Sequence, residues 1–449
     1  MIFSDLNFIF LFLPTFFLSY FIAGDNFKNV IIFLFSILYY IFGNLNNVIN
    51  VYILIILTII NYLFLYNIFS ESDNRIKSIK LYISVFFNIL VIVILKSGLF
   101  LNTMPAGLSF YVFHYISIFI DVKNNNNFGK ISFLRFAQYI IFFPKLLSGP
   151  ITRYDLFEKT YSNKDISFDN FLKGLYIFAI GLSLKCILSD NIYNIINTIN
   201  VYGYESISIF TAWVGMYSYT MNLYFDFAGY SLMAIGIAKS IGIVLPDNFN
   251  LPFLSKSVSE FWRRWHITLG QFFRDYVYIP LGGHCDHKNI YRQIVNIVVV
   301  WLLTGLWHGF KINYLLWAML VCIIIIMEKT LLLKVYKKCD IIGRIIVIVL
   351  IPFTFLIFSI ENINNLKLYI LKLIDFSTIK SLRDFESILK SYYKVFIVGL
   401  LFMTHIPKLL FMKIYNCRYI MVIITIILIV LSCYMINVTN SDLFKYFTF

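Results

Sequence analysis

Long apolar runs separated by short polar segments form the main pattern of this chain. The runs that span, or nearly span, a bilayer cover residues 6–23, 29–43, 47–69, 80–95, 105–120, 132–149, 170–189, 207–224, 228–245, 294–310, 312–333, 342–360, 393–412 and 417–437. A straight transmembrane helix needs about 20 apolar residues, and several runs are shorter than that. The pattern therefore predicts an all-α polytopic membrane protein with about eleven to thirteen transmembrane helices and some re-entrant or amphipathic helices.

One stretch, residues 259–308, departs from this pattern because it places charges close together in an apolar setting. The charged residues in its first half are Glu260, Arg263, Arg264, Arg274 and Asp275. At about 2.5–3.5 kcal/mol for each unpaired charge at mid-membrane, these residues would oppose insertion by more than about 12 kcal/mol. We therefore expect the stretch to lie at an interface, to line a water-filled recess, or to pack against helices that pair its charges.

Composition favours one membrane-embedded domain. The 449 residues are 60% hydrophobic and 13% charged, whereas a soluble domain carries about 25% charged residues. No polar segment is long enough for a soluble domain of ordinary size, so we predict a single domain over 1–449 with its core over 100–335. The net charge of +14 lies mostly in short loops between apolar runs, which indicates contact with anionic membrane lipid rather than nucleic acid.

Helical spacing predicts one amphipathic helix through the first half of the charged stretch, because apolar residues recur at that spacing at Phe261, Trp265, Leu269, Phe272 and Tyr276. Glu260 and Arg264 stand four residues apart, so they can pair on one helix face. His266 lies beside this basic cluster and is a candidate catalytic residue, with Arg263 and Arg264 as candidate substrate-binding residues. The alternative is an interfacial helix whose charges pair with one another and which carries out no chemistry.

His308 is a sharper candidate, in the sequence Gly-Leu-Trp-His-Gly over 305–309. An imidazole in a dry site tends to stay neutral, and a neutral imidazole can accept a proton. His308 could therefore act as a general base that activates a hydroxyl group toward a thioester carbonyl. Trp307 beside it is a candidate substrate-binding residue. Alternatively, Gly305 and Gly309 form a helix-packing face on which His308 makes an interhelical hydrogen bond.

Two further polar residues, His114 and Asp226, stand in apolar runs. His114 follows Pro105 and Gly107, which suggest a bend near a cavity. Asp226 stands among aromatic residues, where a carboxylate without a purpose is unusual. Both are candidate substrate-binding residues. The alternatives are a hydrogen-bonded packing histidine and an aspartate that pairs with a nearby arginine.

The sequence offers little for a metal or a tightly bound cofactor. It has no P-loop, dinucleotide-binding fingerprint or Ser-His-Asp arrangement. The segment His-Cys-Asp-His at 284–287 supplies adjacent ligand types, but no second pair follows at the spacing of a zinc site. We therefore predict no metal site and no tightly bound cofactor.

Two segments in combination resemble the bacterial membrane-bound O-acyltransferase family, particularly its alginate O-acetyltransferase branch. They are SVSEFWRRWHITLGQFFRDYVYIPLGG at 257–283 and WLLTGLWHG at 301–309. Supporting matches are MIFSDLNFIFLFLP, GLSFYVFHYISIFIDV, FPKLLSGPITRY, YFDFAGYSLMAIGIA, PDNFNLPF and the aromatic tail Phe444–Phe449. The resemblance implies a multi-helix bundle around a central tunnel. It also implies that His308 is the catalytic residue and His266 the second active-site residue.

The resemblance further implies a reaction and its partners. Acetyl would move from a cytoplasmic thioester, acetyl-CoA or another acyl donor, across the membrane toward hydroxyls of a cell-envelope polysaccharide or other glycan. An extracytoplasmic acetyltransferase partner protein would complete the transfer, and the chain would be a multi-pass protein of the bacterial inner membrane. The YIPLGG ending resembles the polysaccharide-acetylating branch more than the branch that serves D-alanylation of teichoic acids.

The chain also departs from the family pattern. Leu232 stands where relatives often carry an acidic residue, and the segment 353–362 lacks an expected arginine, so no role transfers to either place. A transporter or flippase for a lipid-linked or acyl species remains the alternative function, because intramembrane charges and broken helices suit transport as well. A third possibility is an inactive scaffold for other envelope enzymes.

Overall fold

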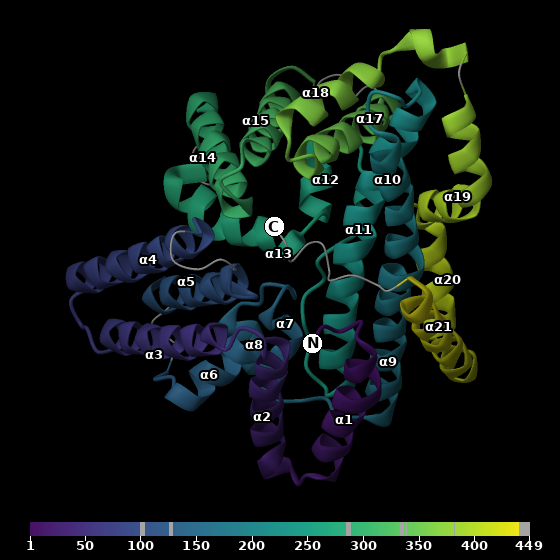
Figure 1. The fold of residues 1–449 in the computed structure, drawn as a ribbon. Helices are drawn as coiled ribbons and strands as arrows, with labels where there is room; N and C mark the ends of the chain where they lie inside the picture. Colours follow the sequence, from purple (N-terminus) through teal and green to yellow (C-terminus); the bar gives the residue numbers. More distant parts are fainter. Residues whose placement is uncertain are drawn as a thin grey trace. The chain divides into compact units, whose positions relative to one another are not determined.

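The fold is helical throughout the part of the chain that the structure describes. The structure is a computed structural model, and it describes residues 1–98, 104–124, 129–283, 289–332, 336, 339–380 and 382–439. Every regular element in these ranges is a helix, and no strand occurs among them (Figure 1). The predicted all-α polytopic fold is therefore confirmed.

The chain divides into two compact units. The first consists of Met1–Ala179 and Tyr230–Pro246, and the second of Ile180–Gly229 and Asp247–Phe449. Two helices, α9 (Phe168–Ser183) and α11 (Ile209–Ser240), each contribute residues to both units. The single domain with its core over 100–335 stays a prediction.

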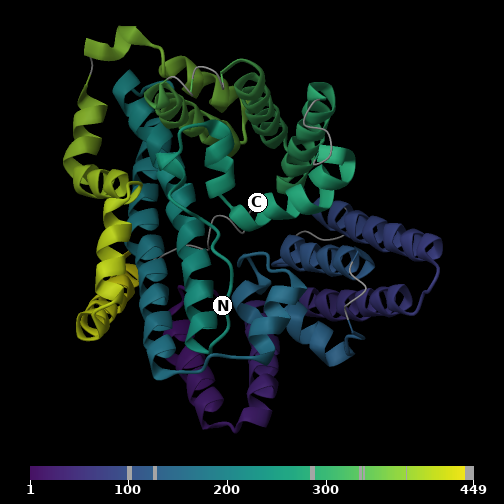
Figure 2. The same ribbon diagram turned by 180° about the vertical axis from the view of Figure 1, so that it is seen from behind.

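The first unit is built from helices that pack through aromatic side chains. Its other elements are η1 (Phe8–Phe12), α1 (Leu13–Ile22), α2 (Asp25–Gly43), α3 (Ile49–Phe69), α4 (Asn74–Lys96), α5 (Leu108–Asn124), α6 (Phe133–Ile141), α7 (Phe143–Leu146) and α8 (Tyr154–Ser162). Figure 2 shows α3, α4 and α5, coloured from purple to blue along the chain, side by side. The Phe143 ring packs edge-on against Phe12 and Phe16, with centroids 5.7 and 5.2 Å away, so aromatic packing joins α7 to the N-terminal helices.

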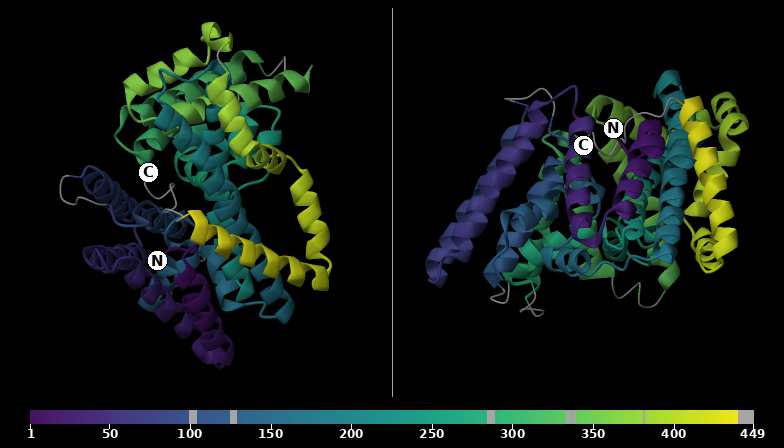
Figure 3. Two further views of the ribbon diagram at one scale, coloured as in Figure 1. Left: turned by 45° about the vertical axis from the view of Figure 1, so that its right-hand side comes forward. Right: turned by 90° about the horizontal axis from the view of Figure 1, so that it is seen from below.

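The second unit contains the charged stretch and all the helices that follow it. Its other elements are η2 (Leu184–Ser189), α10 (Asp190–Tyr202), η3 (Pro252–Leu254), α12 (Val258–Arg264), α13 (Ile267–Phe273), η4 (Arg274–Gly283), α14 (Ile290–His308), α15 (Ile312–Met327), η5 (Glu328–Leu332), α17 (Asp340–Ser359), α18 (Ile363–Lys372), η6 (Phe376–Lys380), α19 (Arg383–Phe402), α20 (Ile406–Tyr415) and α21 (Arg418–Thr439). Helices α14 and α15 approach closely at Gly305, where an added Cβ would lie 2.8 Å from the Cβ of Ala318. Figure 3 shows α19, α20 and α21 as consecutive segments. The chain bends by 74° between α19 and α20.

Eight helices in the described residues are long and apolar enough to cross a membrane, or nine if the bent pair α19 and α20 forms one span. This number is lower than the expected eleven to thirteen, which rested on about 20 apolar residues for each crossing. The runs 207–224 and 228–245 join in the single helix α11, and the run 132–149 forms the two short helices α6 and α7. Hydropathy alone does not show where a helix continues and where it breaks, so the number of crossings stays a prediction.

Candidate active site

A cavity in the second unit brings together both candidate catalytic histidines. Its volume is about 430 Å³, and small-molecule sites commonly measure about 300–1,000 Å³. The polar residues on its wall include Arg263, His266, Gln271, Arg274, Thr304 and His308. Aromatic residues cover other parts of the wall, namely Trp262, Trp301, Trp317, Phe355 and Phe358. Segments far apart in the sequence thus form one pocket with basic, hydrogen-bonding and apolar surfaces.

His308 is the last residue of α14, and aromatic rings hold its side chain. The centroid of its imidazole lies 4.4 Å from that of Trp307, 4.8 Å from Phe358 and 5.2 Å from Trp317. The residue is 8% exposed, so it reaches the cavity wall while most of its surface is covered. These edge-on contacts restrict the orientation of the ring, which general-base catalysis requires.

His266 occupies a break between α12 and α13, so the prediction of one amphipathic helix through this point is wrong. The residue has a φ of 43°, and the left-handed region costs an ordinary L-residue about 1–2 kcal/mol. A contact distant in sequence compensates this cost, because the His266 Nδ1 atom lies 3.0 Å from the Oδ1 atom of Asn248. The break places the imidazole on the cavity wall.

The protonation state of His266 follows from its burial. The residue lies outside the candidate membrane spans and is 4% exposed. Burial lowers the pKa of the imidazole to about 3, because the charged ring would lose its hydration. His266 is therefore neutral at physiological pH, and one of its two ring nitrogens carries a lone pair.

The two arginines of the basic cluster have different surroundings. Arg263 lies on the cavity wall, where it can meet an anionic group. The Arg264 Nη2 atom lies 2.6 Å from a carboxylate oxygen of Glu260, which is the pair that the four-residue spacing predicts. The Nη1 atom of Arg264 also donates to the carbonyl oxygen of Asn250 at 3.4 Å. Because Arg264 is not among the lining residues of the cavity, its contacts favour a structural role.

Trp307 packs against both histidines. Its ring centroid lies 4.4 Å from that of His308 and 6.3 Å from that of His266. Phe227 contacts His266 as well, with a centroid distance of 4.6 Å. Trp307 is not among the residues that line the cavity, so its contact with substrate stays a prediction, and its observed contacts are packing contacts with the two imidazoles.

Asp226 belongs to a buried ion triad. The Lys185 Nζ atom lies 2.8 Å from a carboxylate oxygen of Asp226 and 2.8 Å from one of Asp190. Lys185 and Asp226 are each 1% exposed. The partner of Asp226 is thus a lysine in η2 and not the arginine expected in the alternative interpretation. None of the three residues lines the cavity, so these contacts favour structural pairing over contact with substrate.

His114 lies in α5 of the first unit, where backbone groups engage both of its ring nitrogens. The Nδ1 atom lies 2.7 Å from the carbonyl oxygen of Phe110, and the Nε2 atom accepts a hydrogen bond from the Thr152 N–H at 3.2 Å. His114 has no exposed surface. These contacts match the packing histidine of the alternative interpretation and leave neither nitrogen for a substrate.

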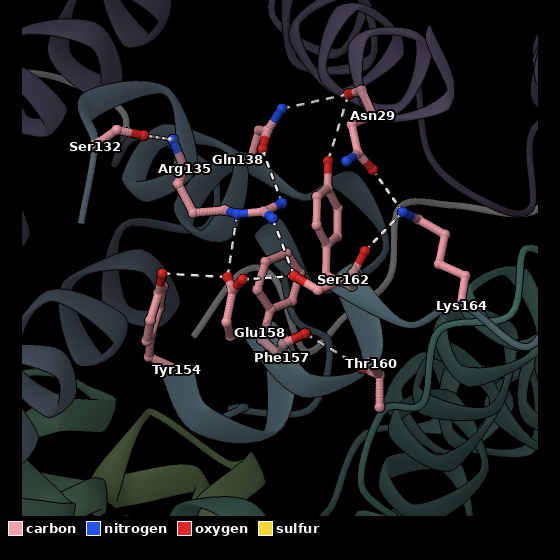
Figure 4. Close-up of polar contacts among 11 residues, drawn as sticks. Asn29, Ser132, Arg135, Gln138, Tyr154, Phe157, Glu158, Thr160, Ser162 and Lys164 are labelled. Atoms are coloured by element: carbon pink, nitrogen blue, oxygen red, sulfur yellow. Dashed lines mark hydrogen bonds and ion pairs between the residues drawn. The ribbon is translucent and has the colours of Figure 1, made fainter. Parts of the chain in front are cut away.

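A polar network in the first unit joins α2, α6 and α8 (Figure 4). The Arg135 Nε atom lies 3.2 Å from a carboxylate oxygen of Glu158, and the Arg135 Nη2 atom donates to the Ser162 hydroxyl at 3.0 Å. Lys164 donates to the side-chain oxygen of Asn29 at 2.5 Å. Because these polar groups satisfy one another, the network ties the three helices together.

Metal-ligand clusters are not found in the part of the chain that the structure describes. No group of three or more His, Cys, Asp or Glu side chains that could hold a metal occurs there. The His-Cys-Asp-His segment at 284–287 and the aromatic tail at 444–449 lie outside the described residues.

The tryptophans of the cavity wall were not predicted from the sequence. The ring centroids of Trp262, Trp301 and Trp317 lie 4.9–5.7 Å from one another. A tryptophan in a chain this apolar indicates, by itself, only packing. A usable signal is the concentration of tryptophans along the chain, since four of the six fall within 259–308, and three of these four, Trp262, Trp265 and Trp301, line the cavity.

Glu328 fixes the start of α12, which carries Arg263 to the cavity. Its buried carboxylate accepts hydrogen bonds from the backbone N–H groups of Val258 at 2.8 Å and Ser259 at 2.7 Å. Glu328→Ala should lower the free energy of unfolding by about 3 kcal/mol, because two buried N–H groups lose a charged acceptor. Thermal unfolding in detergent measures this loss.

Glu361→Ala is the matched control, because the Glu361 side chain is 50% exposed and pairs with an exposed Lys311. A surface pair contributes at most about 1 kcal/mol, so this variant should keep the unfolding temperature of the unmodified protein. Equal unfolding temperatures for the two variants would contradict the role of Glu328 in holding α12.

Comparison with known proteins relates the whole arrangement to one family. The model of the membrane-bound O-acyltransferase family matches residues 10–366. A probable alginate O-acetylase of Pseudomonas fluorescens is 33% identical over 325 residues, which cover 71% of this chain and 64% of the relative. The peptidoglycan O-acetyltransferase of Helicobacter pylori is 30% identical over 372 residues, covering 71% of this chain and 69% of the relative. The teichoic acid D-alanyltransferase of Bacillus subtilis is 31% identical over 222 residues, which cover 47% of this chain and 56% of the relative.

The chain spans about 64% of the length of the Pseudomonas fluorescens relative. The residues matched by the family model include both histidines and every lining residue of the cavity. The resemblance that the motifs at 257–283 and 301–309 indicated is therefore confirmed. The chain is a multi-pass membrane protein that belongs to the membrane-bound O-acyltransferase family.

Proposed function

We propose that this chain is an O-acyltransferase that moves acetyl from a thioester donor toward a hydroxyl group of a cell-envelope glycan. The observation that carries the proposal is the presence of His266 and His308 on the wall of one cavity. Relatives named as an alginate O-acetylase and a peptidoglycan O-acetyltransferase support acetyl as the transferred group and a glycan as the acceptor.

The proposed reaction needs one proton acceptor beside the acceptor hydroxyl. The hydroxyl oxygen attacks the thioester carbonyl carbon while the His308 imidazole takes the hydroxyl proton. The carbon–sulfur bond then breaks, and the departing thiolate takes that proton to become a free thiol. General-base assistance of this kind accelerates a reaction by about 10²–10⁴-fold. His266 orients the reacting groups from the same cavity wall.

The cavity wall also suits the proposed donor, acetyl-CoA. Arg263 presents a guanidinium group, and Arg274 presents a second one beside its ion-pair partner Asp275. Guanidinium groups bind phosphate oxygens in a forked geometry. The aromatic wall around Trp262, Trp301 and Trp317 offers apolar surface for the rest of the donor. The donor is a substrate, so no tightly bound cofactor takes part in this reaction.

We further propose that the protein works in the bacterial inner membrane with an extracytoplasmic partner that completes transfer to the glycan. The reason is that the described residues form apolar helices and short connections, without a polar domain that could hold a long polysaccharide. Acetylation of the polymer by the purified chain alone would contradict the need for a partner.

Mass analysis of envelope glycans tests the proposed function. Cells with the protein should carry an acetyl increment on a glycan, and cells without it should lack that increment. Re-expression of the unmodified protein should restore the increment. Identical glycans in the two strains, or a D-alanyl increment in place of acetyl, would contradict the proposal.

A further inference from the structure

We propose that Asn248 is a positioning residue of this site, and that its side-chain oxygen holds His266 in the tautomer with the proton on Nδ1. The inference rests on the proposed function, in which His266 acts at the cavity. It deepens that function because the tautomer decides whether the Nε2 atom of His266 accepts or donates a hydrogen bond.

The hydrogen-bond donors around the Asn248 side chain show which of its two terminal atoms is the amide oxygen. One side-chain atom lies 3.3 Å from the backbone nitrogen of Thr268, 3.0 Å from the Thr268 hydroxyl and 3.0 Å from the His266 Nδ1 atom. A backbone N–H can only donate, so the atom that faces it must be the amide oxygen and not the amide NH₂. An amide oxygen carries no hydrogen. The Nδ1 atom of His266 must therefore be the donor, and the lone pair of the neutral ring lies on Nε2.

Two backbone hydrogen bonds flank the contact between Asn248 and His266 and hold it in place. The carbonyl oxygen of Asn248 accepts from the N–H of Ile267 at 2.9 Å, and the N–H of Asn250 donates to the carbonyl oxygen of Arg264 at 3.0 Å. The segment 248–250 thus runs along the break between α12 and α13. Asn248 is 1% exposed. These hydrogen bonds offset the free-energy cost of the left-handed conformation of His266 and hold its imidazole in one place.

The tautomer has a chemical consequence at the cavity. Asn248 is not among the lining residues, whereas His266 is. The Nδ1 edge of the ring is thus occupied away from the cavity, and the Nε2 edge is the one that can meet a substrate. A neutral ring protonated on Nδ1 can accept a hydrogen bond at Nε2 from an incoming hydroxyl, but it cannot donate one there to a thioester carbonyl. His266 therefore orients the substrate through a second hydroxyl, because the single proton of the attacking hydroxyl goes to His308.

Two substitutions of Asn248 distinguish a residue that sets the His266 tautomer from one that only fills space. Asn248→Ala removes the acceptor and should lower kcat by about 100-fold, because loss of precise orientation costs this much, with KM changed by less than about threefold. Asn248→Asp keeps an acceptor oxygen for all three donors and should retain kcat within about tenfold. Asn250→Ala is the matched control, because the Asn250 side chain accepts from Lys408 instead of the histidine.

Nitrogen NMR of histidine-labelled protein gives a readout that is independent of activity, with His266→Gln used to assign the signal. The unmodified protein and Asn248→Asp should show His266 protonated on Nδ1, and Asn248→Ala should lose that preference. A proton on Nε2 in the unmodified protein would overturn the inference, even if Asn248→Ala failed to fold. Equal loss of kcat in folded Asn248→Ala and Asn248→Asp would overturn it as well.

The inference and the proposed function fail in different ways. If His266→Ala abolishes acyl transfer while Asn248→Ala retains full kcat, Asn248 is not a positioning residue and the proposed function stands. If acyl transfer persists in both His266→Ala and His308→Ala, the proposed function itself is wrong.

Discussion

His308→Ala should lower the rate of acyl transfer by about 1,000-fold, which lies within the 10²–10⁴-fold range of general-base assistance. The His308 ring lies on the wall of the cavity and is held by Trp307, Trp317 and Phe358. A smaller side chain enlarges an existing cavity there, so the protein should still fold. The glycan acetyl content of cells that express the variant measures the effect.

His405→Ala is the matched control for this prediction. His405 precedes α20 and is exposed, so the same substitution there should leave glycan acetylation unchanged. His308→Gln adds a second comparison, because glutamine keeps much of the volume but cannot take a proton at neutral pH. Undiminished acetylation in well-expressed His308→Ala would contradict the assignment of His308 as the base.

Lys185→Met should destabilise the protein by about 3–5 kcal/mol, the cost of removing one partner from a buried ion pair. Lys185 is 1% exposed and contacts both Asp226 and Asp190 at 2.8 Å. Its removal leaves two carboxylates close together without their cation. The expected result is a large drop in the yield of folded protein and in its unfolding temperature, measured in detergent.

Two further variants make this prediction specific. Lys173→Met is the control, since Lys173 pairs with Asp169 on the surface, where the Asp169 side chain is 53% exposed. That substitution should change stability by less than about 1 kcal/mol. Combining Lys185→Met with Asp190→Asn and Asp226→Asn removes the unbalanced charge and should recover much of the stability. Equal stability of Lys185→Met and Lys173→Met would contradict the account of the triad.

Asp226→Asn separates the two interpretations of Asp226. The Lys185–Asp190 pair remains in this variant, so the protein should fold. If Asp226 only pairs with Lys185, acyl transfer per folded molecule should stay within about threefold of the unmodified protein. A loss of about 100-fold would instead support the predicted contact with substrate.

Local patterns predicted some features of the site well. The four-residue spacing of Glu260 and Arg264 predicted an ion pair, and the structure contains it. Apolar runs predicted helices such as α3 and α4 because a membrane span depends mainly on length and hydropathy. Both features involve residues that are close in sequence.

Features that depend on distant residues could not be predicted in the same way. The helix break at His266 exists because Asn248 supplies a hydrogen-bond acceptor from another segment. The runs on either side of Asp226 form one continuous helix, in which the buried carboxylate pairs with Lys185 from another segment. No periodicity within a run shows which residue of another helix will face it.

The most direct test of the central claim is the release of free thiol from acetyl-CoA by the purified protein in the presence of a hydroxyl acceptor. Acyl transfer at the cavity predicts one thiol for each ester formed, and a rate that falls about 1,000-fold in His308→Ala. A transporter or an inactive scaffold would release no thiol. Absence of thiol release from folded protein supplied with donor, acceptor and any required partner would contradict the assignment of this cavity as an acyl-transfer site.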